Sequence, residues 1–449
     1  MRGAHPLVVT AIATVFLGFD AVVTGCQGPV VRAVGDDVLR EYVGTYEWAP
    51  DTFLYLQLWS ELTGKNQLVA FDESGEVRAL YPTDRDAFFA GPGAAVPTAV
   101  ESRIEFQRDG SGRITGLSWQ REGETARTAR HVDIEKRENV QFANGDIKLA
   151  GTLVSPSEGT KHPAIILVHA SGAEDREYLL PLAHFLVGHG VAVLGYDKRG
   201  VGSSSGDWHT ASFDDLAGDV VAAFDYLKTR SDVDASQIGL LGWSQAGWVM
   251  PLAAARAKGI AFLISISGAG IPAAETTIDQ TMNDLRARGL KPETVDQIVD
   301  LMKLQYRFAR TGQGWNDYTA ARAALVARLG QAPETFPASP DDPYLGFVRR
   351  LYFYDPAPTL RQLHIPILAL FGELDDNIIA GKNKAAWDSA LRAGGNPDYT
   401  LRILPKANHL MLEAKLGSNA EMPSLQRFVP AYAETVIDWL ASRVRGVHR

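Results

Sequence analysis

One stretch of the sequence carries a serine in a setting that suits nucleophilic chemistry. The apolar run 238–242 is followed after one residue by Ser244, then by the small residues Ala246 and Gly247 and by an apolar stretch over 248–255. This pattern predicts a strand, a sharp turn that holds the serine, and a helix. Small residues let strand and helix approach each other, and the helix N-terminus favours developing negative charge. The serine is therefore a candidate nucleophile.

A serine nucleophile requires a base that takes its proton and a carboxylate that orients the base. The apolar run 367–371 predicts a strand, and two carboxylates, Asp375 and Asp376, follow its end. The next predicted strand, 399–404, is followed by His409. Because the carboxyl ends of parallel strands meet at one crevice, we expect these side chains to lie near the serine.

Other histidines suit the role of base less well. His184 and His189 fall on the first helix predicted after residue 139, on the side of the sheet away from the serine. His364 precedes its strand and so falls at the opposite edge. His209 lies in a loop before the serine in chain order, and position alone leaves it open as a candidate.

From residue 139 onward, short apolar runs alternate with helical stretches. Fully apolar strands alternating with amphipathic helices predict an α/β fold, a doubly wound and mostly parallel sheet covered on both faces. The alternation stops over about 271–355, where several helices rich in aromatic residues are expected. The sequence therefore predicts a catalytic domain over 139–449 that contains a helical insertion.

The serine turn and the order serine, aspartate, histidine resemble the α/β-hydrolase superfamily. Its signature is G-x-S-x-G, and the last glycine is replaced here by the small residue Ala246. The family pattern G-x-x-D falls on Asp375, which favours that residue over Asp376. The family carries its base on the loop after the last strand, where His409 stands. The resemblance thus implies Ser244 as nucleophile, His409 as base and Asp375 as the orienting carboxylate.

The resemblance also implies two backbone donors for the oxyanion. One is the N–H of Gln245, the residue after the nucleophile. The family usually has His-Gly after the strand at 164–168, with the donor on the following residue. Here the loop begins His169, Ala170, Ser171, which leaves Ser171 as the second donor and makes His169 a residue that braces the loop.

The resemblance covers about residues 139–445. The family places its lid at the insertion over 271–355, whose aromatic side chains suit an apolar substrate pocket or form the lid's own core. The runs 169–176 and 197–202 are similar to those of a bacterial subgroup of secreted and membrane-linked esterases. No G-x-G-x-x-G, Walker or His-Glu-x-x-His motif occurs, so the sequence implies no cofactor and no metal.

Residues 38–137 have the composition of a small all-β domain, a barrel or sandwich. Gly and Pro turns separate six candidate strands, at 53–58, 67–71, 77–81, 87–89, 103–107 and 114–119. The region resembles the lipocalin-like accessory domain appended to some bacterial serine hydrolases. It carries no catalytic constellation, so we expect a module that packs against the catalytic domain or presents substrate to it.

Residues 1–26 have the pattern of an export signal. The apolar run 7–23 ends in small residues before Cys26, and this exit resembles a bacterial lipobox, in which the cysteine is lipidated. Asp20 argues against that interpretation, because a carboxylate is unfavourable in a bilayer. Ordinary secretion, a structural segment and a misplaced start are the alternatives. A lipid anchor implies the cell envelope, with Gln27 favouring the outer membrane; without one the protein is periplasmic or secreted.

Composition narrows the class of function. The 449 residues carry a net charge of −9, which argues against nucleic acid as a partner, and a single cysteine, which excludes a zinc site built on cysteines. We expect a serine hydrolase that cleaves small-molecule carboxylic esters through an acyl-enzyme, with membrane contact only through a lipid anchor. The alternatives are a peptidase or amidase on the same residues, and a hydrolase-like binding protein without turnover.

Overall fold

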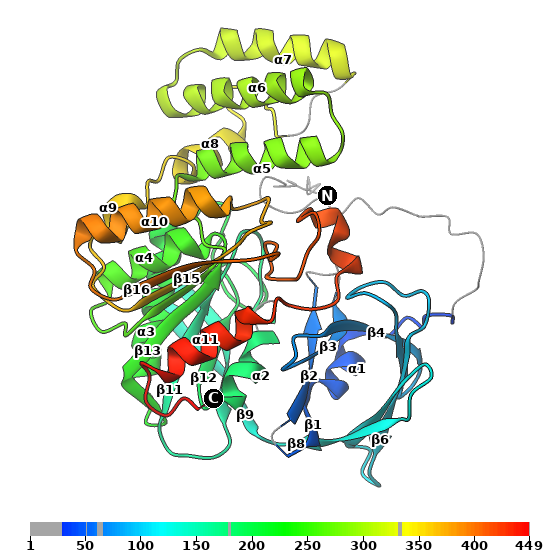
Figure 1. The fold of residues 1–449 in the computed structure, drawn as a ribbon. Helices are drawn as coiled ribbons and strands as arrows, with labels where there is room; N and C mark the ends of the chain where they lie inside the picture. Colours follow the sequence, from blue (N-terminus) through cyan, green and yellow to red (C-terminus); the bar gives the residue numbers. More distant parts are fainter. Residues whose placement is uncertain (1–28, 51, 61–65, 178–180, 331–334, 449) are drawn as a thin grey trace, which may run out of the picture.

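The computed structural model describes residues 29–50, 52–60, 66–177, 181–330 and 335–448. A closed eight-stranded barrel precedes an open eight-stranded sheet covered by helices (Figure 1). The expected export signal with Cys26 lies outside the described residues. Within those residues, no helix combines the length and the apolar character needed to cross a membrane.

The barrel is an antiparallel meander in which each strand pairs with the next, and β1 closes it by pairing with β8. A short helix α1 (Asp36–Leu39) and a turn η1 (Arg40–Tyr42) precede it. Its strands are β1 (Gly44–Ala49), β2 (Thr52–Trp59), β3 (Gln67–Asp72), β4 (Val77–Asp84), β5 (Ala87–Ala90), β6 (Ser102–Arg108), β7 (Ile114–Arg121) and β8 (Arg127–Val132). The six strands predicted from the sequence are all present, and β1 and β8 were not predicted individually.

Apolar side chains fill the interior of the barrel. Leu56, Leu117 and Phe88 belong to one buried cluster there, together with the ring of Tyr42. The Tyr42 hydroxyl donates a hydrogen bond of 2.9 Å to Asp86, which also pairs with Arg108, as expected where a polar group on a buried ring needs a partner. The barrel therefore has a packed core of its own.

The second sheet has the order β16-β15-β14-β13-β11-β12-β10-β9, mostly parallel, with an antiparallel hairpin at one edge. The hairpin turns at Asn144–Gly145–Asp146, where an Asn-Gly pair suits the tight turn between two antiparallel strands. The strands are β9 (Glu135–Asn144), β10 (Ile147–Pro156), β11 (His162–Val168), β12 (Ala192–Tyr196), β13 (Val233–Trp243), β14 (Leu263–Ile266), β15 (Ile367–Gly372) and β16 (Tyr399–Leu404). This is the α/β arrangement predicted from the alternating pattern.

Helices bury both faces of this sheet in separate apolar cores. One core holds α3 (Phe213–Lys228), α4 (Ala246–Arg256), α9 (Ala357–Leu360) and α10 (Ala380–Gly394). The other holds α2 (Pro181–Gly188) and α11 (Ala431–Ala441). Figure 1 shows α2 and α11 on the side nearer the barrel.

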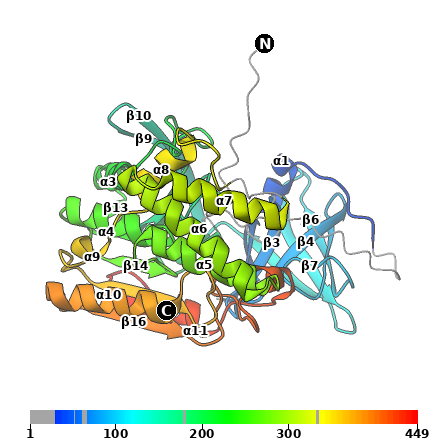
Figure 2. The ribbon, with the colours of Figure 1, turned by 90° about the horizontal axis from the view of Figure 1, so that it is seen from above.

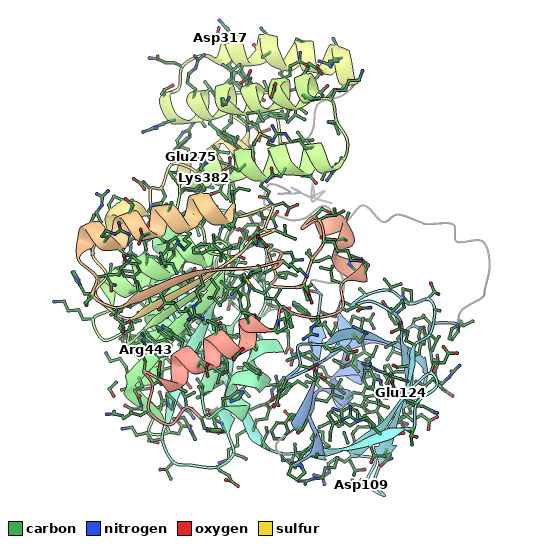
Figure 3. The ribbon with its side chains drawn as sticks, viewed as in Figure 1. Asp109, Glu124, Glu275, Asp317, Lys382 and Arg443 are labelled. Carbon is green, nitrogen blue, oxygen red and sulfur yellow. The ribbon has the colours of Figure 1, made fainter. Side chains whose placement is uncertain are left out.

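The helical insertion leaves the sheet after β14 and returns to it before β15. It consists of α5 (Ala273–Ala287), α6 (Pro292–Thr311), α7 (Trp315–Leu329) and α8 (Pro343–Leu351). These helices lie together on one side of the sheet domain, stacked above it in Figure 1 and seen from above in Figure 2. Lys382 of α10 ties α5 to the sheet domain through Asp279 at 2.7 Å and Glu275 at 3.5 Å (Figure 3).

Most aromatic side chains of the insertion are buried among themselves. The buried ones are Tyr306, Phe308, Tyr318, Phe347 and Tyr352. Trp315, Tyr344 and Phe353 are partly buried and pack against them. The rings therefore serve mainly as the core of the insertion, which is one of the two roles that the sequence left open.

Candidate active site

Ser244 occupies the turn between β13 and α4, as the sequence predicts. Its φ of +53° lies in the left-handed region, which is strained for a residue with a side chain. The turn is held in place because the Ser244 N–H donates to the carbonyl of Ile266 at 3.1 Å, and the Ser244 carbonyl accepts from Gly247 at 2.9 Å. A strained residue on a sharp strand-to-helix turn is the geometry that presents a nucleophilic side chain.

The replacement of the last signature glycine by Ala246 is accommodated by glycines on either side. A side chain at position 242 would approach the Ala246 methyl group to 2.5 Å, so Gly242 makes room for the alanine. A side chain at position 247 would come within 2.6 Å of the Ala269 carbonyl oxygen, so Gly247 allows α4 to approach the end of β14. The departure from G-x-S-x-G therefore leaves the turn intact.

Asp375 and His409 meet at the carboxyl ends of the adjacent strands β15 and β16. His409 Nδ1 lies 2.9 Å from Asp375 Oδ2. The other oxygen, Oδ1, accepts from the backbone N–H groups of Asn377 at 2.9 Å and Ile378 at 2.8 Å. The Asp375 side chain is fully buried and that of His409 is 14% exposed. This arrangement fixes the imidazole ring by its Nδ1 edge.

Asp376, the alternative carboxylate, lies in a different environment. Its Oδ1 is buried without a hydrogen-bond partner among the described residues, whereas Asp375 makes the bond to His409. Burial, and then the nearby charge of Asp375, raise the pKa of Asp376 to about 6. The two neighbouring carboxylates therefore differ sharply in hydrogen bonding.

The loop that carries His409 is braced by the residue before it. The side-chain oxygen of Asn408 accepts from the N–H groups of Leu410 at 3.0 Å and Leu412 at 2.9 Å. The Asn408 N–H donates back to the Leu412 carbonyl at 3.0 Å. These bonds close a tight loop, which leads directly into residues 410–429, called the histidine-loop segment below.

The histidine-loop segment, which includes η2 (Asn419–Ser424), packs on the outside of the barrel. Leu412 and Leu425 share a buried apolar cluster with barrel residues that include Val77. The Val77 N–H donates to the Gln426 carbonyl at 2.9 Å, so the backbone of β4 also holds the segment. The barrel and the loop bearing His409 are therefore in direct contact, which the sequence did not predict.

The loop after β11, residues 169–174, is the predicted source of a backbone donor. His169 donates from Nε2 to the carbonyl of Tyr196 at 2.5 Å, in agreement with its predicted bracing role. Burial, and then the nearby Lys198, lower the pKa of His169 to about 3, so its ring is neutral at physiological pH. Ala170 N–H donates to Glu174 at 2.8 Å.

The two N–H groups predicted to bind the oxyanion differ from the Ala170 N–H, which already has an acceptor. Across the described residues, the backbone N–H groups of Ser171 and Gln245 donate no intramolecular hydrogen bond. Gln245 begins the turn into α4, so its N–H lies at a helix N-terminus. Both amides are therefore available to a ligand atom.

Three of the histidines considered as alternative bases have other partners. His184 is fully buried between Glu135 at 2.6 Å and Gln57 of the barrel at 2.5 Å, and so links barrel and sheet domain. His189 interacts with the carbonyl of His448 at 2.9 Å. His209, left open by the sequence, is half-exposed and interacts with Asp207. Within the described residues, no group of three or more potential metal-binding side chains is present.

Comparison with known proteins identifies the family. The profile of the Alpha/beta hydrolase family matches residues 165–417, more than half of the chain, and the chain therefore belongs to this family. Esterase EstD of Thermotoga maritima is 26% identical over 321 residues, which cover 68% of each chain. The quorum-quenching protein AidA of Acinetobacter baumannii is 28% identical over 128 residues, 28% of this chain and 42% of AidA.

Two solved esterase structures are among those similar to part of the chain. The esterase Pf2001 of Pyrococcus furiosus is 16% identical, with a TM-score of 0.42 over 69% of this chain and 92% of its own. Est1E of Butyrivibrio proteoclasticus, solved with ferulic acid, is 17% identical, with a TM-score of 0.43 over 68% of this chain and 99% of its own.

Lys198 and Glu174 are two charged residues close to the predicted site that the sequence did not assign to it. Lys198 contacts the loop after β11 and the side chain of Gln245, and Glu174 bonds to the same loop. The available signal was a lysine two residues past an apolar strand, where a charged residue falls at the carboxyl edge of the sheet.

Proposed function

We propose that this protein is a carboxylic ester hydrolase in which Ser244 is the nucleophile, His409 the general base and Asp375 the residue that orients the base. The proposal rests on the 2.9 Å bond between His409 and Asp375, together with the position of Ser244 on a strained strand-to-helix turn. Membership of a family that includes esterases, with EstD among the relatives, supports the ester as the substrate class.

The proposed reaction proceeds in two balanced halves. Ser244 Oγ attacks the ester carbonyl carbon while its proton passes to Nε2 of His409, and the carbonyl electrons form an oxyanion. Collapse of this intermediate breaks the bond to the alcohol, which takes the proton from His409, and leaves an acyl-serine. Water then attacks the acyl group with the same proton transfers and releases the acid. Asp375 keeps Nδ1 protonated, so that Nε2 is the nitrogen that accepts.

The oxyanion is held by the backbone N–H groups of Gln245 and Ser171 in this proposal. Within the described part of the chain neither amide donates to an internal acceptor, whereas the amide of Ala170 donates to Glu174. Preorganised donors of this kind each contribute about 10²–10³-fold to kcat. The N-terminus of α4 adds a favourable partial positive charge at the same place.

A panel of substrates tests the class of reaction. We expect hydrolysis of p-nitrophenyl esters of short and medium acyl chains, and little or no hydrolysis of aminoacyl p-nitroanilides. A peptidase or amidase on the same residues is the alternative, and faster cleavage of the anilides than of the esters would establish it. The series of acyl lengths would also define the preferred substrate.

We propose three modules for the chain: an export signal over 1–26, a barrel over 38–137, and a catalytic domain over 139–449 with its lid about 271–355. The barrel has the eight-stranded up-and-down topology of lipocalin-like barrels, which supports the predicted accessory domain. The similarity of 197–202 to secreted and membrane-linked bacterial esterases supports placement in that subgroup.

We also propose that Cys26 anchors the mature protein to the cell envelope, with the outer membrane as its destination. Cys26 is the sole cysteine and follows an apolar run and small residues. Lipoprotein processing adds three acyl chains, and two membrane signals already suffice for stable anchoring. The protein should label with a palmitate analogue and fractionate with membranes, and Cys26→Ser should abolish both. An unlabelled, fully soluble exported protein would contradict the anchor.

A further inference from the structure

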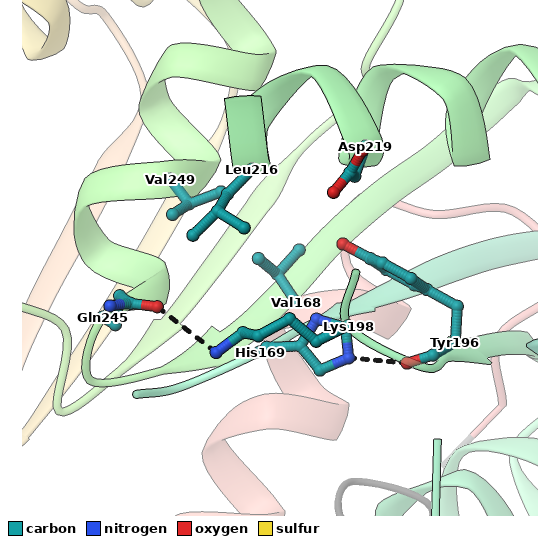
Figure 4. A pocket seen from close by; sticks show the side chains of 8 residues that line it. All are labelled: Val168, His169, Tyr196, Lys198, Leu216, Asp219, Gln245 and Val249. Atoms are coloured by element: carbon teal, nitrogen blue, oxygen red, sulfur yellow. Dashed lines mark hydrogen bonds between the residues drawn. The ribbon is translucent and has the colours of Figure 1, made fainter. Parts of the chain in front are cut away.

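A buried lysine lies directly behind the proposed oxyanion site. Lys198 follows β12 and is only 2% exposed. Its ammonium donates to the carbonyl oxygens of Ala170 and Gly172, both at 2.7 Å, and approaches the side-chain oxygen of Gln245 at 3.5 Å. Figure 4 shows the lysine reaching across the cavity toward Gln245. The three N–H donors of the ammonium are therefore all directed to the loop and the turn that border the site.

The Ala170 carbonyl belongs to the same peptide group as the N–H of Ser171. In a trans peptide these two groups point in opposite directions. A bond from Lys198 to the carbonyl therefore fixes the direction in which the Ser171 N–H points, away from the lysine. It also withdraws electron density from the amide, which strengthens the N–H as a donor.

The bonds on the flanking peptide groups hold the loop at two further places. Glu174 accepts the Ala170 N–H at 2.8 Å, and Lys198 binds the Gly172 carbonyl beyond Ser171. The same ammonium lies beside the side chain of Gln245, whose N–H is the other proposed donor. One buried cation thus connects the segments that supply both donors.

We propose that Lys198 is the positioning residue of the oxyanion hole: it orients and polarises the Ala170–Ser171 peptide group and holds it in register with Gln245. Lys198 does not touch the substrate and acts through the backbone. This inference rests on the proposed function, since it assumes that an oxyanion forms at Ser244.

The neighbours of Lys198 in the run 197–202 have separate tasks. Asp197 binds Arg176 at the far end of the loop through two bonds of 2.8 and 2.9 Å. Arg199 pairs with Asp219 of α3 at 2.7 Å and, among the described residues, forms no hydrogen bond with the loop. Arg199 together with Asp219 is therefore a matched control, because neutralising both removes a buried charge pair next in sequence without leaving an unpaired charge in the cavity of Lys198.

The charge on Lys198 has a testable pH dependence. Burial lowers the pKa of Lys198 to about 8, although the Glu174 carboxylate favours the charged form. Three other titratable groups line the same cavity: His169, neutral because its pKa is about 3; Tyr196, whose pKa is raised by burial; and Asp219, held by Arg199. We therefore expect kcat to fall as the pH rises through about 8, because the ammonium loses its proton.

Four variants test the proposal with p-nitrophenyl acetate and with a trifluoromethyl ketone, whose serine adduct carries an oxyanion. Lys198→Met should lower kcat by about 10²-fold and should lower the affinity for the trifluoromethyl ketone by a similar factor. The KM for p-nitrophenyl acetate should change less than about threefold. Lys198→Arg should remove the fall in kcat above pH 8, because its guanidinium stays charged. The charge-balanced control Arg199→Met, Asp219→Asn should lower Tm but keep kcat within about threefold of the wild type. Should Lys198→Met not fold, the charge-balanced Lys198→Met, Glu174→Gln protein takes its place.

The outcomes separate this proposal from the proposed function. Activity retained by Ser244→Ala would refute the nucleophile and leave no oxyanion for Lys198 to serve. An inactive Ser244→Ala together with a folded Lys198→Met that keeps wild-type kcat and ketone affinity would refute the role of Lys198 alone. An alkaline fall in kcat that persists unchanged in Lys198→Arg would also overturn it.

Discussion

The contact between the barrel and the histidine-loop segment predicts that the barrel supports catalysis from a distance. Leu425 lies in this segment, is 5% exposed and packs against the outside of the barrel. Leu117 is fully buried inside the barrel and takes no part in this contact. Leu425→Ala and Leu117→Ala thus remove the same atoms from two buried places, one joined to the His409 loop and one not.

The structure sets the size of the expected effect. Truncation of a buried leucine to alanine costs about 2–5 kcal/mol, because transfer free energy and packing are both lost. In Leu425→Ala this loss falls on the docking of the segment, so the loop that carries His409 is held less firmly in its place. A displacement of about 1 Å in a catalytic group can lower the rate about 10²-fold. We therefore expect kcat/KM to fall about tenfold or more in Leu425→Ala.

The assay compares the two variants at 25 °C with p-nitrophenyl acetate, and follows amide hydrogen exchange over residues 406–429. Leu425→Ala should lose activity and exchange faster in this region. Leu117→Ala should lose thermal stability while its kcat/KM stays near the wild-type value. Equal activity of the two variants, or faster exchange in both, would refute the idea that the barrel holds the histidine loop through this contact.

Two further predictions concern the neighbouring carboxylates. Asp375→Asn should lower kcat about 10³–10⁴-fold, because only the partner of His409 controls its tautomer, whereas Asp376→Asn should have a far smaller effect; steady-state kinetics giving the reverse order would assign the role to Asp376. Because burial and Asp375 raise the pKa of Asp376 to about 6, folding favours its protonated form and stability is lost as the pH rises through about 6. Asp376→Asn should therefore gain Tm over the wild type between pH 4 and pH 7, and a gap that is constant with pH would contradict this cause.

Local sequence patterns were sufficient to predict the elements of the sheet domain. Buried parallel strands such as β13 and β15 are continuous apolar runs. The proposed nucleophile and its orienting carboxylate, Ser244 and Asp375, each follow such a run. The turn at Ser244 could be predicted because small residues must surround it, and glycines at 242 and 247 indeed lie where a side chain would clash. Strand ends thus located Asp375 and His409 at one edge of the sheet.

The barrel was less completely predictable. β8 was not recognised as a strand because it is rich in charged residues and only Ala129 among its side chains is buried. β1 begins at Gly44, whose backbone approaches the ring of His131 on β8, a contact that no local pattern encodes. Strands that close a barrel pair over long sequence separations, so their partners are set by tertiary packing.

The surroundings of the site depend on contacts that are distant in sequence. Lys198 meets the loop at 170–172 only because β11 and β12 are neighbours in the sheet. The packing of Leu425 on β4 joins residues that lie more than three hundred positions apart. Neither contact has a periodic or motif signature, and both emerge only from the folded chain.

The central claim is that Ser244 is the nucleophile of an acyl-transfer reaction. Intact-protein mass spectrometry after treatment with a fluorophosphonate measures this directly, because the reagent phosphonylates an activated serine. We expect one adduct per chain, located on Ser244 by peptide mapping, with parallel loss of esterase activity. Ser244→Ala should take up no reagent and lose kcat by about 10⁵-fold or more while keeping its Tm. An adduct on another residue, or a Ser244→Ala protein that retains more than a few per cent of activity, would contradict the claim.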